Sequence, residues 1–366
     1  MAKVIGLVTA NYYVENPSDL VASRPVASMP YLGRYRLVDF ALSNMVNAGI
    51  RTGGFVMPPN YRSLSDHVGS GKDWGLDRKN GGLFVMPGSA FGTSRKGGRF
   101  LVRDLILNKQ FLERNTEDYV VLSTCNIIYN VDLKEVVKAH VESGADITLL
   151  TKKTTEDNAD VVALETDSVG VTGVHMGVTF GDTGFLDLAV MKRELLLEML
   201  GWYSAMDHKD LFEALADSGD ISRVSVKTVD FPGYVTAVFN KQDYYKGNMD
   251  LLNPKVLDEV TPESRFIKTK SHDNPPAKFE PGSHVTNSLV SAGDRIYGTV
   301  VDSVLSREVV IEPGAIVRAS IIMQGTVIKS GARVENAVID RNNVVTAGTE
   351  LRGTPEDVYV QVKGRA

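Results

Sequence analysis

Residues Gly33–Ile50 read GRYRLVDFALSNMVNAGI, and this stretch sets the frame for the rest of the chain. Its apolar residues recur at the spacing of one helical face, at Val38, Ala41, Leu42, Met45 and Val46. Gly49 follows, and glycine is the residue type that most often closes a helix. The pattern therefore predicts an amphipathic helix that begins after a turn carrying a basic Arg-Tyr-Arg triplet.

Strand and helix patterns alternate through the first 150 residues. Val4–Thr9 and Phe55–Met57 flank the predicted helix, and Tyr119–Ser123 and Ile147–Thr151 lie on either side of a helix pattern at Leu133–Ser143. Alternation of this kind predicts an α/β fold, with a Rossmann-like, mostly parallel sheet covered by helices on both faces.

The turn after the first predicted strand lacks the residue type expected there. Residues 9–14 read TANYYV, with Asn11 near the middle and no glycine. In nucleotide-binding enzymes of this layout, glycines let backbone N–H groups approach the phosphates. Residues with a Cβ atom resist the backbone angles that such a loop requires. We therefore expect no phosphate-binding loop at this position.

Length and composition restrict the class of protein. A chain of 366 residues fits two domains, and no apolar run approaches the roughly 20 residues of a membrane span. Cys125 is the single cysteine, which excludes an internal disulfide framework and suits a reducing cytosol. A net charge of −5 provides no basic stripe for nucleic acid. We expect a cytoplasmic protein that binds neither nucleic acid nor a membrane.

The C-terminal part contains an internal repeat. Two aliphatic residues, two small or polar residues and a glycine recur, and the last three copies start at 310, 327 and 344, a period of 17. Short strands that turn on glycine at a fixed period are typical of a parallel β-helix. A proline-rich stretch precedes the repeat and reads as a linker. The expected organisation is a sheet domain at 1–252, a linker at 253–284 and a β-helix at 285–366.

Two further features carry less information. The glycine-rich segment 58–99 is loop-like, and the sequence leaves open whether it is functional or a flexible surface insertion. The six histidines show no paired spacing, so we expect no zinc site.

Several short motifs together resemble bacterial glucose-1-phosphate adenylyltransferases, the ADP-glucose pyrophosphorylases of glycogen synthesis. The motifs are Gly33–Phe40 with Leu42-Ser43-Asn44, Tyr244-Tyr245 with 248–252, Asn287–Val290 and Val338–Arg341. The resemblance covers nearly the whole chain. It implies a nucleotidyltransferase domain followed by a left-handed parallel β-helix. The family reaction joins glucose 1-phosphate to the α-phosphate of ATP and depends on Mg²⁺, basic groups and backbone amides.

The residues that perform this chemistry in the family are replaced in this chain. The glycine-rich phosphate loop is absent around Asn11, and Cys125-Asn126 stands where a catalytic, metal-binding aspartate is expected. Ala237 stands at the position of a second metal-binding aspartate. The sugar-phosphate lysine has no match between 161 and 188, and a nucleotide loop is replaced around 98–102. Because Mg²⁺ needs carboxylate oxygens, the chain is expected to have no catalytic residue, no metal site and no cofactor of its own.

The resemblance also assigns residues that are retained. Arg24, Arg34 and Arg36 match positions near which family members bind anionic sugar-phosphate effectors, and arginines bind phosphate well. The alternative interpretation is a set of surface salt bridges. Lys209-Asp210 corresponds to an element near the family's sugar site, but it also fits the solvated first turn of a helix. Cys125 is expected to be a buried structural thiol, because no histidine lies nearby in sequence to activate it.

Three hypotheses follow from these observations. The first, favoured here, is a GlgD-type regulatory subunit that joins a catalytic subunit in a heterotetramer, with Mg²⁺ and ATP bound by the partner. The second is a divergent, weakly active ADP-glucose pyrophosphorylase. The third is a homo-oligomeric scaffold that senses sugar phosphates.

Overall fold

The structure, a computed structural model, describes residues 2–12, 19–22, 24–90 and 98–364. Contacts divide the chain into two units, each of which is assembled from separate segments. Unit 1 comprises Met1–Glu15, Phe40–Val235 and Glu263–Lys268. Unit 2 comprises Asn16–Asp39, Thr236–Pro262 and Thr269–Ala366. The division expected from the sequence at 252 and 285 stays a prediction, but the chain passes between these units more than once.

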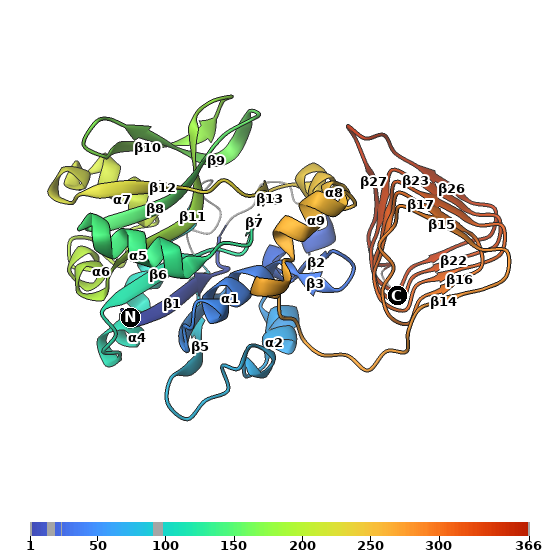
Figure 1. Cartoon of the computed structure of the whole chain (residues 1–366), viewed down its shortest axis with the longest axis horizontal. Helices are drawn as coiled ribbons and strands as arrows, with labels where there is room; N and C mark the ends of the chain where they lie inside the picture. The colour runs from blue at the N-terminus through green and yellow to red at the C-terminus, as the bar shows by residue number, and fades with distance from the viewer. Residues whose placement is uncertain (1, 13–18, 23, 91–97, 365–366) are drawn as a thin grey trace. The chain divides into compact units, whose positions relative to one another are not determined.

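Unit 1 is built on a sheet to which nine of the described strands belong, with β10-β9-β11-β6-β1-β4-β5 along its main path. Strand β1 (Val4–Thr9) runs parallel to β4 (Thr52–Met57) on one side and to β6 (Tyr119–Ser123) on the other. All three strands are buried, so they are apolar on both faces. Strand β5 (Gly82–Pro87) continues the parallel half beyond β4. The expected parallel core of the sheet is confirmed (Figure 1).

The other half of the sheet is mixed. Strand β11 (Thr183–Lys192) pairs antiparallel with β6, with Leu188 opposite Ser123, and also with β8 (Ile147–Lys153). The remaining strands are β9 (Asn158–Thr166), β10 (Val171–Val178) and β12 (Val226–Asp230). Because β11 runs against β6, the amino-terminal half of β11 reaches the sheet edge at which β1 and β6 end.

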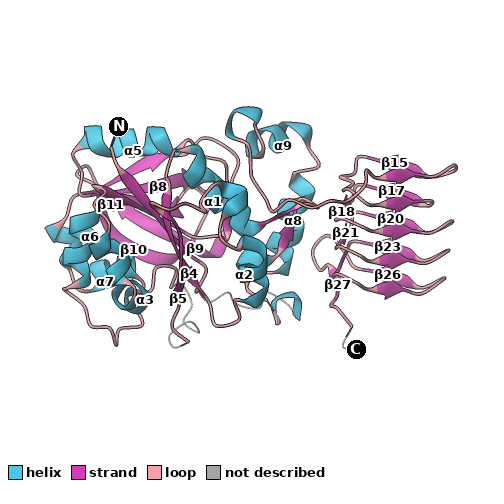
Figure 2. Ribbon diagram, turned by 90° about the horizontal axis from the view of Figure 1, so that it is seen from below, coloured by secondary structure: helices cyan, strands magenta, loops and turns pink. Residues whose placement is uncertain are grey.

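Helices pack around this sheet (Figure 2). The predicted signature helix is confirmed as α1 (Leu37–Asn47), and Gly49 after it has a φ of 86°, in the left-handed region. Asp132 caps α5 (Leu133–Ser143) by accepting a hydrogen bond from the Lys134 backbone N–H at 3.1 Å. The other α-helices of unit 1 are α2 (Arg62–Val68), α3 (Val102–Leu107), α4 (Lys109–Arg114), α6 (Arg193–Leu200) and α7 (Leu211–Asp217).

The prediction of a loop for residues 58–99 is wrong for much of that segment. It contains α2 and β5, and four of the glycines that suggested irregular backbone, Gly69, Gly71, Gly75 and Gly81, lie between these elements. Gly69, Gly71 and Gly75 have positive φ angles, so they form the turns between regular elements. Residues 91–97 of the same segment lie outside the described residues.

The repeat in unit 2 is a parallel β-helix, as predicted. Its strands stack in three parallel sheets, and Val310, Val327 and Val344 are in register one coil apart. The inward residues, such as Ile311 and Ile328, have no exposed surface. The strands are β14 (Lys278–Phe279), β15 (His284–Thr286), β16 (Arg295–Ile296), β17 (Thr299–Val301), β18 (Val304–Leu305), β19 (Val310–Ile311), β20 (Ile316–Arg318), β21 (Ile321–Ile322), β22 (Val327–Ile328), β23 (Arg333–Glu335), β24 (Ala337–Ile339), β25 (Val344–Val345), β26 (Glu350–Arg352) and β27 (Tyr359–Gln361).

A ladder of serine hydroxyls, of which Ser303 and Ser320 are buried, joins successive coils of the β-helix. The Ser303 N–H donates to Ser288 Oγ at 3.0 Å, and the Ser320 N–H donates to Ser303 Oγ at 3.1 Å. The Ala337 N–H continues the ladder to Ser320 Oγ at 3.1 Å. One corner of each coil is therefore tied to the next coil by a side chain as well as by strand pairing.

Much of the family-like signature serves to assemble unit 2. The motif residues Tyr244 and Asn248 lie on α8 (Lys241–Asp250). The Tyr244 hydroxyl donates to the Pro30 carbonyl oxygen at 2.6 Å, and Asn248 Oδ1 accepts from the Leu32 N–H at 3.0 Å. These bonds hold the hairpin formed by β2 (Pro30–Tyr31) and β3 (Tyr35–Arg36), which precedes α1.

Gly33, in the turn of this hairpin, cannot be replaced without strain. Its φ is 70°, and a Cβ atom there would lie 2.6 Å from both the Leu305 carbonyl oxygen and Ser291 Oγ.

The expected linker is also partly regular, because it contains α9 (Pro254–Val260) and the first β-helix strand, β14. Strands β7 (Ile127–Ile128) and β13 (Thr236–Ala237) complete the described strands.

Two neighbouring valines in one strand test the inward and outward pattern of the β-helix. Val345 is 2% exposed and Val344 is 54% exposed. We expect Val345→Ala to lower the free energy of unfolding of the β-helix by about 2 kcal/mol, because it leaves a cavity. Val344→Ala should change it by less than about 0.5 kcal/mol. Urea unfolding followed by circular dichroism measures both, and equal effects would contradict the assigned register.

Candidate functional site

The candidate site lies where parallel strands β1 and β6 end. The residues after β1 are Ala10-Asn11-Tyr12, and those after β6 are Thr124-Cys125-Asn126. In α/β sheets, ligands usually bind outside the carboxyl ends of parallel strands. In this chain, side chains of the protein itself occupy much of that edge.

Asn11 is buried in a network that anchors the turn after β1. Its Nδ2 donates to the Ser89 carbonyl oxygen at 3.0 Å and to Asp104 Oδ2 at 2.5 Å. Asp104 Oδ1 accepts from the Ser89 N–H at 2.7 Å. Burial raises the pKa of Asp104, and the hydrogen bond from Asn11 opposes that rise. Asn11 therefore ties β1 to Ser89 and to α3, which carries Asp104.

A buried ion pair occupies the same sheet edge. Asp187, in β11, has a φ of 50°, and its Oδ2 accepts from Thr124 Oγ1 at 3.2 Å. Arg99 Nε lies 3.4 Å from the same oxygen, and the two side chains are 3% and 2% exposed. Burial raises the pKa of Asp187 to about 6, although Arg99 lowers it. The guanidinium of Arg99 also lies 6.0 Å from the centre of the Tyr12 ring.

Asp210 joins this constellation through the backbone. It caps α7 by accepting from the Phe212 N–H at 2.8 Å, and its other oxygen accepts from the N–H groups of Arg99 and Phe100 at 2.9 and 2.6 Å. Lys209 points elsewhere, because its ammonium pairs with Asp217 at the protein surface. Lys209 and Asp210 therefore do not act together on one ligand in this arrangement.

A small cleft of about 110 Å³ opens beside these groups. Arg99, Asp187 and Asp210 line it, together with Glu213 and Asp217 of α7. Its volume is well below that of most ligand pockets, which range from roughly 300 to 1,000 Å³.

The side chains at the two substituted positions after β6 are buried. Cys125 is 1% exposed and Asn126 is fully buried. Neither polar atom of the Asn126 side chain has a hydrogen-bond partner among the described residues. Ala237 lies in β13, in unit 2, so it is not placed relative to this edge.

The residues at this edge do not fit a magnesium ion. Mg²⁺ prefers carboxylate and water oxygens in octahedral geometry. Asp187 is paired with Arg99, and both oxygens of Asp210 accept backbone hydrogen bonds. Within the described part of the chain, no group of three or more His, Cys, Asp or Glu residues could hold a metal.

The predicted anion-binding arginines lie in unit 2. Arg24 is 2% exposed and is committed to Asp340, with its Nη2 2.9 Å from Asp340 Oδ1. Burial, together with the positive charges of Arg341, Arg24 and Arg307, lowers the pKa of Arg36 to about 10, although Asp39 opposes the shift. Arg36 therefore lies among like charges.

Arg34 is exposed and contacts Tyr35 and Arg307. Its guanidinium lies 4.9 Å from the centre of the Tyr35 ring, and its carbonyl oxygen accepts from Arg307 Nη2 at 2.6 Å. Burial lowers the pKa of Arg307, and the charge of Arg34 adds to that effect. We call the five residues the arginine cluster: Arg24, Arg34, Arg36, Arg307 and Arg341.

The sequence alone did not indicate every residue of these two groups. Arg307 and Arg341 are far from Arg36 in sequence, and only the coiling of the β-helix brings them to it. Asp187 left a clearer signal, because it is an acidic residue inside the apolar run FLDLAV at 185–190. A charge inside a buried strand requires a partner, which here is Arg99.

Comparison with known families agrees with this architecture. Residues 18–161 match the nucleotidyl transferase family, and residues 275–357 match the GlmU-like C-terminal hexapeptide family. The fold is thus a nucleotidyltransferase domain followed by a left-handed parallel β-helix.

Relatives that align with most of the chain identify its family more closely. The chain is 30% identical over 319 residues to the glycogen biosynthesis protein GlgD of Bacillus subtilis, covering 85% of this chain and 82% of that one. It is 31% identical to GlgD of Geobacillus stearothermophilus, covering 86% and 83%. A glucose-1-phosphate adenylyltransferase of Fervidobacterium nodosum is 27% identical, covering 88% and 79%. The chain belongs to the GlgD family.

None of the helices formed by the described residues has the length and apolar character needed to cross a membrane.

The raised pKa of Asp187 leads to a prediction about pH. Because the folded-state pKa, about 6, lies above the ordinary value of 3.8, the folded protein binds this proton more tightly. The contribution of Asp187 to stability is therefore largest at low pH and is lost as the pH rises through 6. Relative to Asp187→Asn, the wild-type protein should lose about 1 to 2 kcal/mol of unfolding free energy between pH 5 and pH 8.

Urea unfolding at several pH values measures this difference. Asp77→Asn, at an exposed aspartate, is the control and should follow the wild type across the range. A constant difference between wild type and Asp187→Asn would mean that Asp187 does not titrate in this window.

Proposed function

We propose that this chain is a regulatory, catalytically impaired subunit of a glucose-1-phosphate adenylyltransferase in glycogen biosynthesis, and that it activates a catalytic partner. The observation that carries the proposal is the state of the sheet edge. A buried Arg99–Asp187 pair and the Asn11 network occupy the described part of this edge, beside a cleft of about 110 Å³. Relatives over most of the chain include proteins named for glycogen biosynthesis and for glucose-1-phosphate adenylyltransferase.

The chemistry explains why such an edge is poor at catalysis. Transfer of a nucleotidyl group from ATP to glucose 1-phosphate requires positioned phosphates and neutralisation of their developing charge. Asn11, Cys125 and Asn126 supply no carboxylate, and Asp187 is already neutralised by Arg99. On this proposal Mg²⁺ and ATP bind to the catalytic partner, in a cytoplasmic complex such as a heterotetramer.

The arginine cluster supports a role in effector binding. Bidentate hydrogen bonds from guanidinium groups suit phosphate oxygens. Arg36 and Arg307 both have lowered pKa values, because burial and neighbouring cations disfavour their charge. A bound sugar phosphate would relieve that repulsion. Arg24, which is paired with Asp340, would brace the site, while Arg34, Arg36, Arg307 and Arg341 would hold the anion.

One assay tests the proposed regulatory role. ADP-glucose formation is measured with this chain alone, with a catalytic subunit from the same organism alone, and with the mixture. We expect negligible synthesis by this chain alone and a severalfold higher rate for the mixture than for the catalytic subunit. A substantial rate from the pure chain, or Mg²⁺-dependent heat on ATP titration, would favour a divergent enzyme. An unchanged rate in the mixture, with no complex formed, would favour a separate scaffold.

Substitution of Arg36 tests the effector site. In the mixture, Arg36→Ala should reduce the response to a sugar bisphosphate by about tenfold or more, because a charged hydrogen bond is worth about 1.5 to 3 kcal/mol. The activation that does not depend on the effector should remain. Arg333→Ala, at an exposed arginine of β23, is the matched control. The same effector response in both variants would contradict the assignment.

A further inference from the structure

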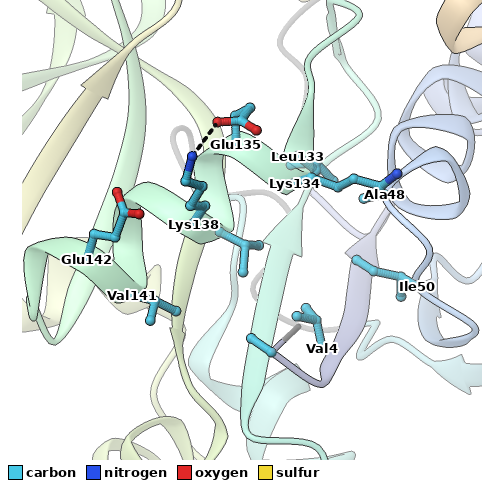
Figure 3. A pocket seen from close by; sticks show the side chains of 11 residues that line it. Val4, Ala48, Ile50, Leu133, Lys134, Glu135, Lys138, Val141 and Glu142 are labelled. Carbon is cyan, nitrogen blue, oxygen red and sulfur yellow. Dashed lines mark ion pairs between the residues drawn. The ribbon is translucent and has the colours of Figure 1, made fainter.

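A second pocket lies at the opposite edge of the unit 1 sheet, where β1 begins. Ala2 and Val4 form one wall, Ala48 and Ile50 follow α1, and the remaining lining residues belong to the α5 segment 133–142 (Figure 3). Its volume is about 370 Å³, more than three times that of the cleft beside Asp187 and within the range of small-molecule pockets. It shares no residue with the candidate site or the arginine cluster.

The floor of this pocket is aliphatic. Val4 and Ile50 face Leu133, Val137 and Val141, which lie on one face of α5 because they are spaced by four residues. Leu133 and Val137 are buried, but Val141 is 45% exposed. An apolar body in the pocket would remove this surface from water.

The charged rim offers one cation for a ligand. Lys138 Nζ lies 3.6 Å from Glu135 Oε2, so these two charges largely neutralise each other. Lys134 reaches across the mouth toward Ala48 (Figure 3) and has no ion-pair partner among the described residues. Lys134 also lies in the first turn of α5, where the helix dipole disfavours a positive charge. Glu142 lies at the far end of the pocket from Lys134 (Figure 3).

We propose that this pocket binds a small amphiphile with an aliphatic or aryl body and one anionic group. The body fills the space between Ile50, Val137 and Val141, and the anion lies beside Lys134. Allowing roughly 20 Å³ for each non-hydrogen atom, the volume admits about 15 to 20 such atoms. The site is independent of the proposed regulatory role, because it uses neither the sheet edge at β6 nor the arginines.

Fluorescence titration of the full chain with 2-aminonaphthalene-6-sulfonate, a fluorescent aryl anion whose size fits that volume, tests the proposal. We expect saturable binding at one site per chain. Val141→Asp should weaken binding by about tenfold, because it places a like charge beside the dye. Lys134→Gln should weaken it by about threefold, and octanoate should displace the dye more effectively than octanol does.

Matched substitutions distinguish this site from other apolar surface. Val169→Asp, at a valine that is 79% exposed and outside the pocket, should leave binding unchanged. Lys138→Gln should have a smaller effect than Lys134→Gln, because Lys138 is already paired. Circular dichroism verifies that each variant is folded. Equal binding of the dye by Val141→Asp and Val169→Asp would overturn the proposal. It would also be overturned if the wild type bound no dye and Val141→Asp changed the oligomeric state, because the surface would then be a contact between chains.

Discussion

A carboxylate removed from water must be neutralised, and in unit 1 that requirement falls on Asp187. The residue lies in an apolar strand, at an edge where β1 and β6 also end. An unpaired charge there would be costly, and breaking a buried pair is strongly destabilising. The guanidinium of Arg99 supplies the neutralising charge, and the backbone N–H of Arg99 donates a hydrogen bond to Asp210 at the start of α7. Arg99 thus connects β11, through the ion pair, and α7, through its backbone N–H, to the segment before α3.

On the function proposed above, this arrangement accounts for a sheet edge that does not perform the enzyme's chemistry. A cation that belongs to the protein is already in place beside Asp187, so the carboxylate has little left to offer a metal ion. The strained backbone of Asp187, at a φ of 50°, persists because hydrogen bonds and packing hold it. The resulting edge is organised by internal contacts, whereas in unit 2 five guanidinium groups gather around the carboxylates of Asp39 and Asp340.

The sequence predicted those features that are encoded by local periodicity. The helix α1 followed from its 3.6-residue repeat, and the β-helix followed from a period of 17 residues. Features that depend on distant pairing were not predictable in this way. The antiparallel course of β11 brings Asp187 to Thr124, and the division of the chain places 16–39 with the β-helix. Gly33 and Tyr244 were recognisable as a signature, but their structural reason lies in contacts with Leu305 and Pro30.

The serine ladder gives the β-helix a direction. Each hydroxyl accepts a bond from the following coil, and the sequence of donors ends at Ala337, whose methyl group cannot accept another. The coil after Ala337 therefore lacks the serine bond at this corner, where it is held by the pairing of β24 with β27 and by a longer bond of 3.4 Å from Asn336 Nδ2 to the Gly353 carbonyl oxygen. In a stack where each coil contacts only its neighbours, opening begins at the weaker end. Fraying should thus start at the C-terminal coil and stop at the serine-linked ones, so that the coils that carry Arg307 remain ordered longest.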